Sequence, residues 1–417
     1  MTTRSNLAII QKTFLRGRKM KKTLVLATLL IPLLLLPQLA LSQTSEADEA
    51  YIKAMTAQTP AQRAQLLKDY LGKYAGKGTK YENFAYANLC LLAYPGKTEK
   101  ETIDYGEKAL SVGGLDDLTK TQVLLVLSGL YSKSGQNLDR AKSYANQAVE
   151  IGKANKDKGA AESSGAEWNK IIGAAYFTLG QAQEKNKETA AAIDSYVASY
   201  SLLKNPQILQ TLKKLAKTQY DNKQFTEAEK TGRAIYNLTK DFESSVFLAK
   251  CLYRNGRNEE ALKYFKEAYA KQRSGEIAYN IGLILAKEAQ TNPAAVMEAI
   301  TYLIEASFTY PSQAQQAMSM AESLFFTANK NLKYNETVQQ LQELGKKIEE
   351  LTNTYNSKFG NKEEENLSEA EKKEMKNLLA QIEEAKKAIE KLQAEQNMAI
   401  AQFNKLLEET KKKLGIK

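Results

Sequence analysis

Residues 249–273 read AKCLYRNGRNEEALKYFKEAYAKQR, which is two helical patterns separated by a turn. In the second half, Ala261, Phe265 and Ala268 are spaced i, i+4, i+7, so their side chains share one face of an α-helix. In the first half, Ala249 is followed by a leucine three positions later, on one face of a partner helix. Small residues on a shared face allow close approach of the neighbouring helix. The stretch therefore predicts a helix, a short turn and a second helix.

The same triplet of small and large residues recurs along the middle of the chain. Gly173 and Gly282 begin corresponding i, i+3 pairs in the helices that precede two of the triplets. The first residues of successive triplets lie 33 to 51 positions apart, which we interpret as loop insertions in a degenerate helical array. The other four triplets are Ala141, Ala145, Ala148; Ala192, Tyr196, Ser199; Ala228, Gly232, Ile235; and Ala299, Leu303, Ala306.

This pattern resembles the tetratricopeptide repeat (TPR) family, whose unit of about 34 residues pairs two helices. The match is best over residues 249–273 and extends roughly over residues 80–330. The proline that often closes the unit occurs only at Pro206 and Pro311. The resemblance implies an all-α fold, a right-handed TPR-like α-solenoid of antiparallel helix pairs, in which each pair packs only on its neighbours.

In this family, the first helix of each pair lines the concave face and contacts ligands through exposed positions one turn apart. Carried onto this chain, those positions form a basic, aromatic stripe suited to an extended acidic or C-terminal peptide. The alternative for each residue taken alone is a solvated lysine or a tyrosine packed on its neighbour. The candidate groove residues are Lys213, Lys217, Tyr220, Lys250, Tyr253 and Tyr279.

The carboxyl-terminal residues 334–417 have a different pattern, in which apolar positions alternate three and four apart. Such spacing predicts a coiled-coil seam flanked by lysine and glutamate. Ser368 and Glu371 form a capping box at the start of this helix, and residues 359–362 form the turn of a helical hairpin. The seam positions are Met375, Leu378, Ile382, Ala385, Ile389, Leu392, Gln396, Ala399, Phe403 and Leu406.

The second helix of this hairpin is predicted to be nearly twice as long as the first. Half of its apolar stripe therefore lacks a partner within the hairpin, and Gln396 in the seam is placed to fix the register. Two coverings are possible for the remaining half: a second copy of the chain, which would make a homo-oligomer, or the array itself.

Residues 1–42 have the three parts of a secretory signal peptide: a basic start, an apolar run over residues 23–41, and small residues for cleavage. We expect the mature chain to begin near Gln43, and translation could start at Met20. An uncleaved membrane anchor is the alternative, because the apolar run approaches the length that spans a bilayer. We expect export to the periplasm or the medium, or anchoring in the inner membrane facing the periplasm.

Most of the positive charge belongs to that segment. The chain has a formal net charge of +11, and residues 1–42 carry seven basic and no acidic residues, which leaves about +4 on the remaining 375. The high isoelectric point therefore gives no reason to expect nucleic-acid binding. Neither a Gly-rich phosphate loop nor an aromatic-basic RNA motif is present.

The chain contains no histidine, which removes the commonest general base and zinc ligand. We therefore expect no enzyme activity, no cofactor and no metal site; a carboxylate enzyme acting on cell-wall glycan is a minor alternative. Cys90 and Cys251 lie in apolar helical stretches and belong to repeats that do not touch, so we expect core residues and no disulfide. Trp168 is predicted to be a core or cap residue.

The predicted organisation is therefore a signal peptide, capping helices over residues 43–79, the array over residues 80–333, and the hairpin over residues 334–417. The first functional hypothesis is an exported, non-catalytic scaffold that binds other envelope proteins or peptide segments in its concave groove and self-associates through the coiled coil. The second is a periplasmic holdase-like chaperone whose long amphipathic tail binds unfolded clients. A scaffold would recover a few specific partners, whereas a chaperone would bind many clients weakly.

Overall fold

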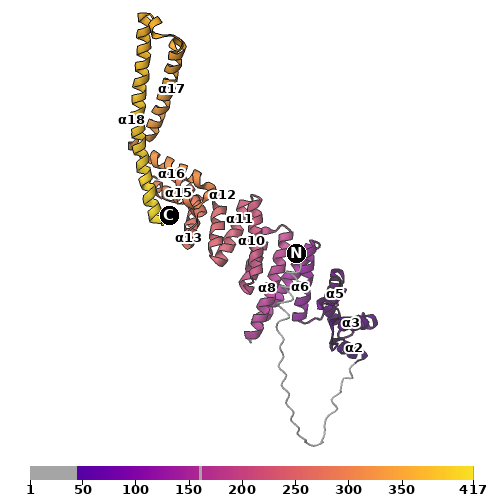
Figure 1. Cartoon of the computed structure of the whole chain (residues 1–417). Helices are drawn as coiled ribbons and strands as arrows, with labels where there is room; N and C mark the ends of the chain where they lie inside the picture. Colours follow the sequence, from indigo (N-terminus) through magenta and orange to yellow (C-terminus); the bar gives the residue numbers. More distant parts are fainter. Residues whose placement is uncertain (1–44, 159–161, 417) are drawn as a thin grey trace, which may run out of the picture. The chain divides into compact units, whose positions relative to one another are not determined.

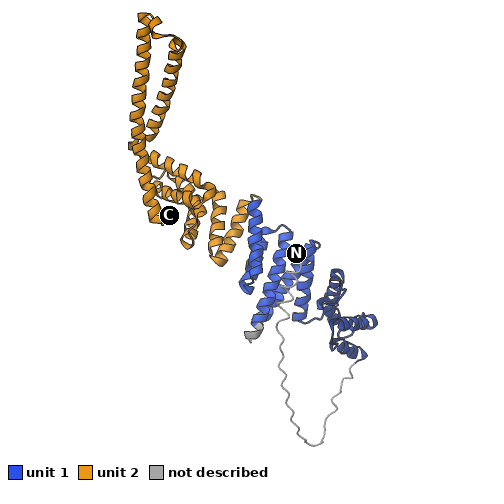
Figure 2. Ribbon diagram, in the orientation of Figure 1, with its two compact units in different colours: residues 1–221 blue, residues 222–417 orange. Residues whose placement is uncertain are grey.

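The computed structural model describes residues 45–158 and 162–416, and these residues form helices and no strand (Figure 1). The chain divides into two compact units, Met1–Asp221 and Asn222–Lys417 (Figure 2). The predicted signal segment lies outside the described residues. Within the described ranges, no helix is both long enough and apolar enough to span a membrane.

Unit 1 is a run of helices in which each packs on the next. Its first pair, α2 and α3, is followed by the pairs α4 with α5, α6 with α7, and α8 with α9. Thr59 caps α3 by accepting a hydrogen bond from the Gln62 backbone, and Pro60 occupies the first position of the helix. The helices are α2 Glu46–Met55, α3 Pro60–Tyr74, α4 Glu82–Leu91, α5 Glu99–Val112, α6 Asp117–Ser134, α7 Leu138–Lys158, α8 Glu162–Lys185, α9 Thr189–Leu203 and α10 Pro206–Asp221.

Unit 2 begins with the same kind of packed helix pairs and ends in a hairpin of two long helices. The pairs α12 with α13 and α14 with α15 pack in order, and α16 packs on α15. The chain then forms a hairpin of two long helices, α17 and α18, which contact each other. The helices are α11 Phe225–Thr239, α12 Phe242–Arg254, α13 Asn258–Lys271, α14 Gly275–Glu288, α15 Ala295–Thr309, α16 Ala314–Ala328, α17 Tyr334–Phe359 and α18 Glu369–Leu414, with short 3-10 turns at Pro311–Gln313, Lys330–Leu332 and Glu364–Asn366.

The predicted triplets form the core between helices. All fifteen of their side chains or glycine positions are buried, and Ala261, Phe265 and Ala268 are fully so. Gly282 shows why a small residue is needed: a Cβ there would lie 2.7 Å from Cγ of Leu303 in the paired helix. The predicted all-α, TPR-like array of helix pairs is confirmed.

One expected loop insertion is instead helical. The triplets that begin at Ala141 and Ala192 lie 51 positions apart, which predicts a loop insertion between them. In the structure α7 runs to Lys158 and α8 begins at Glu162, so these two helices are 21 and 24 residues long. Gly152 and Ile172 pack together in this extended pair, where a Cβ on Gly152 would lie 2.7 Å from Cγ1 of Ile172. The extra residues therefore lengthen a helix pair.

The two cysteines are buried and free, as the sequence predicts. Cys90 lies in α4 of unit 1, and Cys251 lies in α12 of unit 2. Burial raises the pKa of each thiol to about 12, so both stay protonated and unreactive at neutral pH. Trp168 is half-buried against the core cluster of α6, α7 and α8.

Candidate protein-binding surfaces

The six candidate groove residues are divided between the two units. Lys213, Lys217 and Tyr220 lie in α10 of unit 1. The other three lie in unit 2, in α12 and α14. Each set is therefore a local surface of its own unit.

In α10, the lysine best placed for a ligand is Lys217. Its side chain is 73% exposed, and its Nζ lies 2.6 Å from Oδ2 of Asp221 one turn later. Exposed i, i+4 ion pairs contribute only about 0.3–0.5 kcal/mol. A ligand carboxylate can therefore replace Asp221 at little cost. Lys213 and Tyr220 are half-buried beside it.

In unit 2, Lys250 is more firmly held. Its Nζ lies 2.6 Å from Oε1 of Glu276, which joins α12 to α14. Both side chains are about half covered, so this pair links two successive repeats and offers little unpaired charge to a ligand. Tyr253, at the end of α12, is half-buried.

Tyr279 is not at an exposed position, contrary to the expectation for a groove residue. It is only 9% exposed, and its ring centroid lies 5.9 Å from that of Tyr310. The reason is that α14 is buried on several sides: Ile277, Ala278 and Ile281 are also covered. Burial raises the pKa of Tyr279, with smaller effects of Tyr253 and Tyr310. Tyr279 is a core residue.

A repeated tyrosine–glutamate hydrogen bond joins successive second helices of the pairs, and the sequence reading missed it. The Tyr236 hydroxyl in α11 donates to Glu267 in α13 over 2.8 Å. One repeat later, the Tyr269 hydroxyl donates to Glu305 in α15. Both tyrosines lie eight positions after the first alanine of their triplet, and both glutamates lie six positions after theirs. That shared register was the available signal.

These bonds are structural. The hydrogen bond to Glu267 and burial together raise the pKa of Tyr236 to about 12. For Tyr269, burial and then the bond to Glu305 raise the pKa to about 12. The rings also meet a second tyrosine edge to face: Tyr264 lies 5.0 Å from Tyr236. At these two junctions of unit 2, one part-buried polar contact and one aromatic contact therefore join successive repeats.

The seam of α18 is covered in two different ways along its length. Toward the hairpin tip, it packs on α17, where Leu351, Tyr355 and Phe359 meet Met375 and Leu378. Six of the ten predicted seam residues are buried: Met375, Leu378, Ile382, Ala385, Ala399 and Phe403. The other four, Ile389, Leu392, Gln396 and Leu406, are half-buried.

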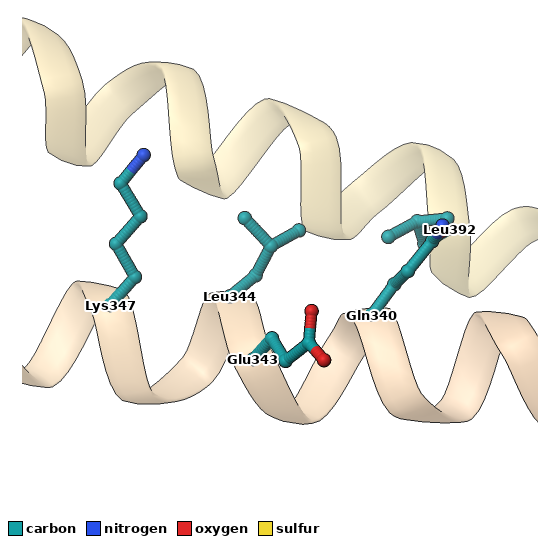
Figure 3. Close-up of a pocket in the computed structure, with 5 residues that line it drawn as sticks. All are labelled: Gln340, Glu343, Leu344, Lys347 and Leu392. Atoms are coloured by element: carbon teal, nitrogen blue, oxygen red, sulfur yellow. The ribbon is translucent and has the colours of Figure 1, made fainter.

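A hollow of about 370 Å³ lies between α17 and α18, in the part of the hairpin away from its turn. Figure 3 shows Leu344 of α17 and Leu392 of α18 between the two ribbons. The hollow is lined by Gln340, Glu343, Leu344, Lys347 and Leu392. Two leucines and three polar or charged side chains therefore line the hollow. The described residues contain no group of three or more cysteine, aspartate or glutamate side chains placed to hold a metal.

The last turns of α18 pack back on the array. Phe403 lies 5.4 Å from Phe325 and 6.0 Å from Phe326, between ring centroids, in a cluster that includes Ile300 and Ile304 of α15. Of the two coverings considered for this half of the helix, the structure therefore shows the array. Figure 1 shows α18 continuing past the end of α17 to lie beside α15.

Polar contacts fix the end of the same segment. The Arg273 guanidinium donates through Nη1 to the Leu414 carbonyl over 3.2 Å. Its Nη2 also lies 3.1 Å from Oε1 of Glu305, whose side chain is 4% exposed. Lys411 Nζ lies 5.1 Å from the centroid of the Phe308 ring. One arginine therefore joins α13, α15 and the carboxyl end of α18.

Comparison with known proteins finds solved structures of low overall similarity to this chain. No family model and no curated protein sequence matches it. Similar solved structures include a tetratricopeptide repeat protein from Parabacteroides merdae (12% identity, 66% of this chain and 98% of that one, TM-score 0.31). Others are the apo form of RapI (11% identity, 84% and 98%, TM-score 0.29) and yeast Tom70 (13% identity, 82% and 65%, TM-score 0.27).

Proposed function

We propose that this protein is an exported, non-catalytic scaffold that binds segments of other envelope proteins along the helical array. The observation that carries the proposal is the capped array. Helix pairs stack in order within each unit, and α18 covers the final helices of unit 2. Stacked pairs of this kind present an extended surface to partners, and each repeat contributes a few side chains to it. The exposed Lys217 of α10 is the best candidate contact in unit 1.

The hairpin gives the scaffold a second element. α18 has 46 residues, a length of about 70 Å at 1.5 Å per residue. Its carboxyl-terminal turns pack on α15 and α16, and the remainder of the same helix pairs with α17. Because one uninterrupted helix runs through both regions, the hairpin is held in a fixed direction relative to the end of unit 2. The hairpin is therefore suited to holding a partner that binds near its tip at a distance from the array.

The same packing favours the scaffold over the chaperone. A holdase tail needs an accessible apolar stripe for unfolded clients. Along α18 that stripe is covered by α17 toward the tip and by α15 and α16 toward the end. The exposed large apolar side chains of α18 are Leu379 and Met398, which lie apart. Isolated exposed apolar residues are ordinary on protein surfaces.

Partner capture with matched charge reversals tests the scaffold proposal. We would compare the proteins co-purified with the exported wild-type chain, with Lys217→Glu, and with Lys230→Glu, an exposed lysine of α11. We expect a short, reproducible partner list that Lys217→Glu loses and Lys230→Glu keeps. A broad list of unfolded exported proteins that is unchanged by both substitutions would contradict the proposal.

A further inference from the structure

The end of the array in unit 2 is an apolar face that holds a helix. Phe325 and Phe326 of α16 and Ile300 and Ile304 of α15 form its buried floor. A repeat array exposes such a face wherever stacking stops, so its end must be covered. Here the cover is the last turns of α18, a segment separated from α16 by more than 70 residues of sequence. It is held by side-chain contacts and one backbone acceptor, without a covalent link.

The covering helix carries the spacing that the array itself uses. Ala399, Phe403 and Leu406 lie at i, i+4, i+7, with the first two buried. Ala261, Phe265 and Ala268 of α13 have the same spacing and are fully buried between helices. In both, a small residue allows close approach, and the aromatic ring fills the gap one turn later. The end face therefore binds a helix by the same packing rule that joins the repeats.

The polar contacts give this site a direction. Arg273 Nη1 donates to the Leu414 carbonyl, which lies at the carboxyl end of α18. The carboxyl end of a helix carries partial negative charge and unpaired carbonyls, so a guanidinium there favours one orientation. Lys411, one turn earlier, lies over the Phe308 ring. A helix bound in reverse would lose both contacts.

We propose that the α15–α16 end face is a second protein-binding site, specific for a partner amphipathic helix with a small–aromatic–leucine triplet whose carboxyl end meets Arg273. Residues 399–414 occupy this site in cis, and a partner helix binds by displacing them. Helix-in-groove recognition of this kind reads anchors at i, i+4 and i+7. The proposal extends the scaffold function to a second surface. It uses no groove residue, so either proposal can fail without the other.

Peptide binding to the full-length chain tests the site. The probe is a fluorescent peptide of residues 396–416, and the readout is fluorescence anisotropy. We expect the peptide to bind the Phe403→Ala chain at least about tenfold more tightly than the wild-type chain. Each weakening of the cis helix by about 1.4 kcal/mol frees the site tenfold more often, and loss of the buried ring weakens the helix by more than that. Equal binding to both chains, or no binding to either, would overturn the proposal.

Two further variants keep the outcome interpretable. Leu406→Ala removes a half-buried side chain of the cis helix and so weakens its packing on the face. This variant is used in place of Phe403→Ala if circular dichroism shows that the Phe403→Ala chain is unfolded. In the peptide, Phe403→Ala should abolish binding, whereas Met398→Ala, at a position 63% exposed, should leave it unchanged. A peptide that binds equally well without its phenylalanine would show adhesion unrelated to this face and would contradict the inference.

Discussion

Phe403 of α18 lies 5.4 Å from Phe325 of α16, between ring centroids. Through this contact, the carboxyl-terminal turns of α18 cover the end of the array. The two residues are 78 positions apart in the sequence and belong to different patterns, the heptad seam and the repeat. Because α18 is one continuous helix, the contact also fixes the hairpin to unit 2.

Loss of the Phe403 ring should destabilise unit 2. The side chain is 3% exposed, and Phe→Ala substitutions at buried positions typically cost about 3–5 kcal/mol, so we expect about 3 kcal/mol from Phe403→Ala at this end position. Chemical denaturation followed by circular dichroism measures the change. Met398→Ala, five positions earlier and mostly exposed, should shift stability by less than about 0.5 kcal/mol. Similar effects of both substitutions would mean that α18 does not dock.

Two glycines should respond in opposite directions to alanine. At Gly345, in the middle of α17, a Cβ would meet no atom within 4 Å, so Gly345→Ala should stabilise the hairpin by about 1 kcal/mol. Gly282→Ala should destabilise unit 2, because the new Cβ would lie 2.7 Å from Cγ of Leu303. Thermal unfolding of the two variants provides the comparison. Equal shifts of the same sign would contradict the packing described for α14 and α15.

Replacing a lysine that has a left-handed backbone conformation with glycine should stabilise the protein. Lys187 and Lys223 have φ of +63° and +61°, and Gly256 has φ of +76° at the corresponding turn between α12 and α13. The left-handed conformation costs an L-residue roughly 1–2 kcal/mol, and glycine avoids this cost. Part of that gain is offset, because glycine loses more conformational entropy than lysine on folding. Lys187→Gly should therefore raise the unfolding free energy by about 0.5–1 kcal/mol. Gly256→Ala should lower it, and a stabilising Gly256→Ala would refute the turn geometry.

The tyrosine–glutamate bonds predict a pH dependence at the alkaline end. The folded pKa of Tyr236 is raised from 10.0 to about 12, first by its hydrogen bond to Glu267. A raised tyrosine pKa means that the folded state holds its proton more tightly. The associated stability is complete below pH 10 and is lost as the pH rises through about 12.

Glu267→Gln should therefore lower the pKa of Tyr236 toward 10. Titration of tyrosines labelled at the ring carbon bearing the hydroxyl, followed by NMR, measures this directly. Glu259→Gln is the matched control, since Glu259 is exposed in the neighbouring helix α13. An unchanged titration of Tyr236 in the Glu267→Gln chain would show that the bond between α11 and α13 does not form in solution.

The sequence predicted those parts of the fold that depend on local periodicity. The triplets gave the helix pairs and their buried faces, and Ser368 with Glu371 gave the start of α18, where each backbone N–H is bonded by the other's side chain. Periodicity could not assign polar residues 155–158 to α7, because this last turn is largely exposed and carries no apolar pattern. It also could not place Phe403 on Phe325, since local spacing does not specify which distant helices meet.

The candidate surface was less predictable for a similar reason. Exposure of Tyr279 was inferred from one helical face, but α14 contacts neighbours on several sides and buries it. Lys250 was expected to be available, yet Glu276 in the next pair neutralises it. The burial of Tyr279 and the pairing of Lys250 both depend on side chains of neighbouring helices. The spacing within one repeat does not specify those side chains.

Site-specific photo-crosslinking in intact cells tests the scaffold proposal most directly. A photoreactive amino acid would replace Lys217, Tyr253 or, as the control, Lys230, and crosslinked partners would be identified by mass spectrometry. The proposal predicts that the first two positions give a small, reproducible set of envelope proteins that position 230 does not give. The same diffuse set of proteins from all three positions would contradict it.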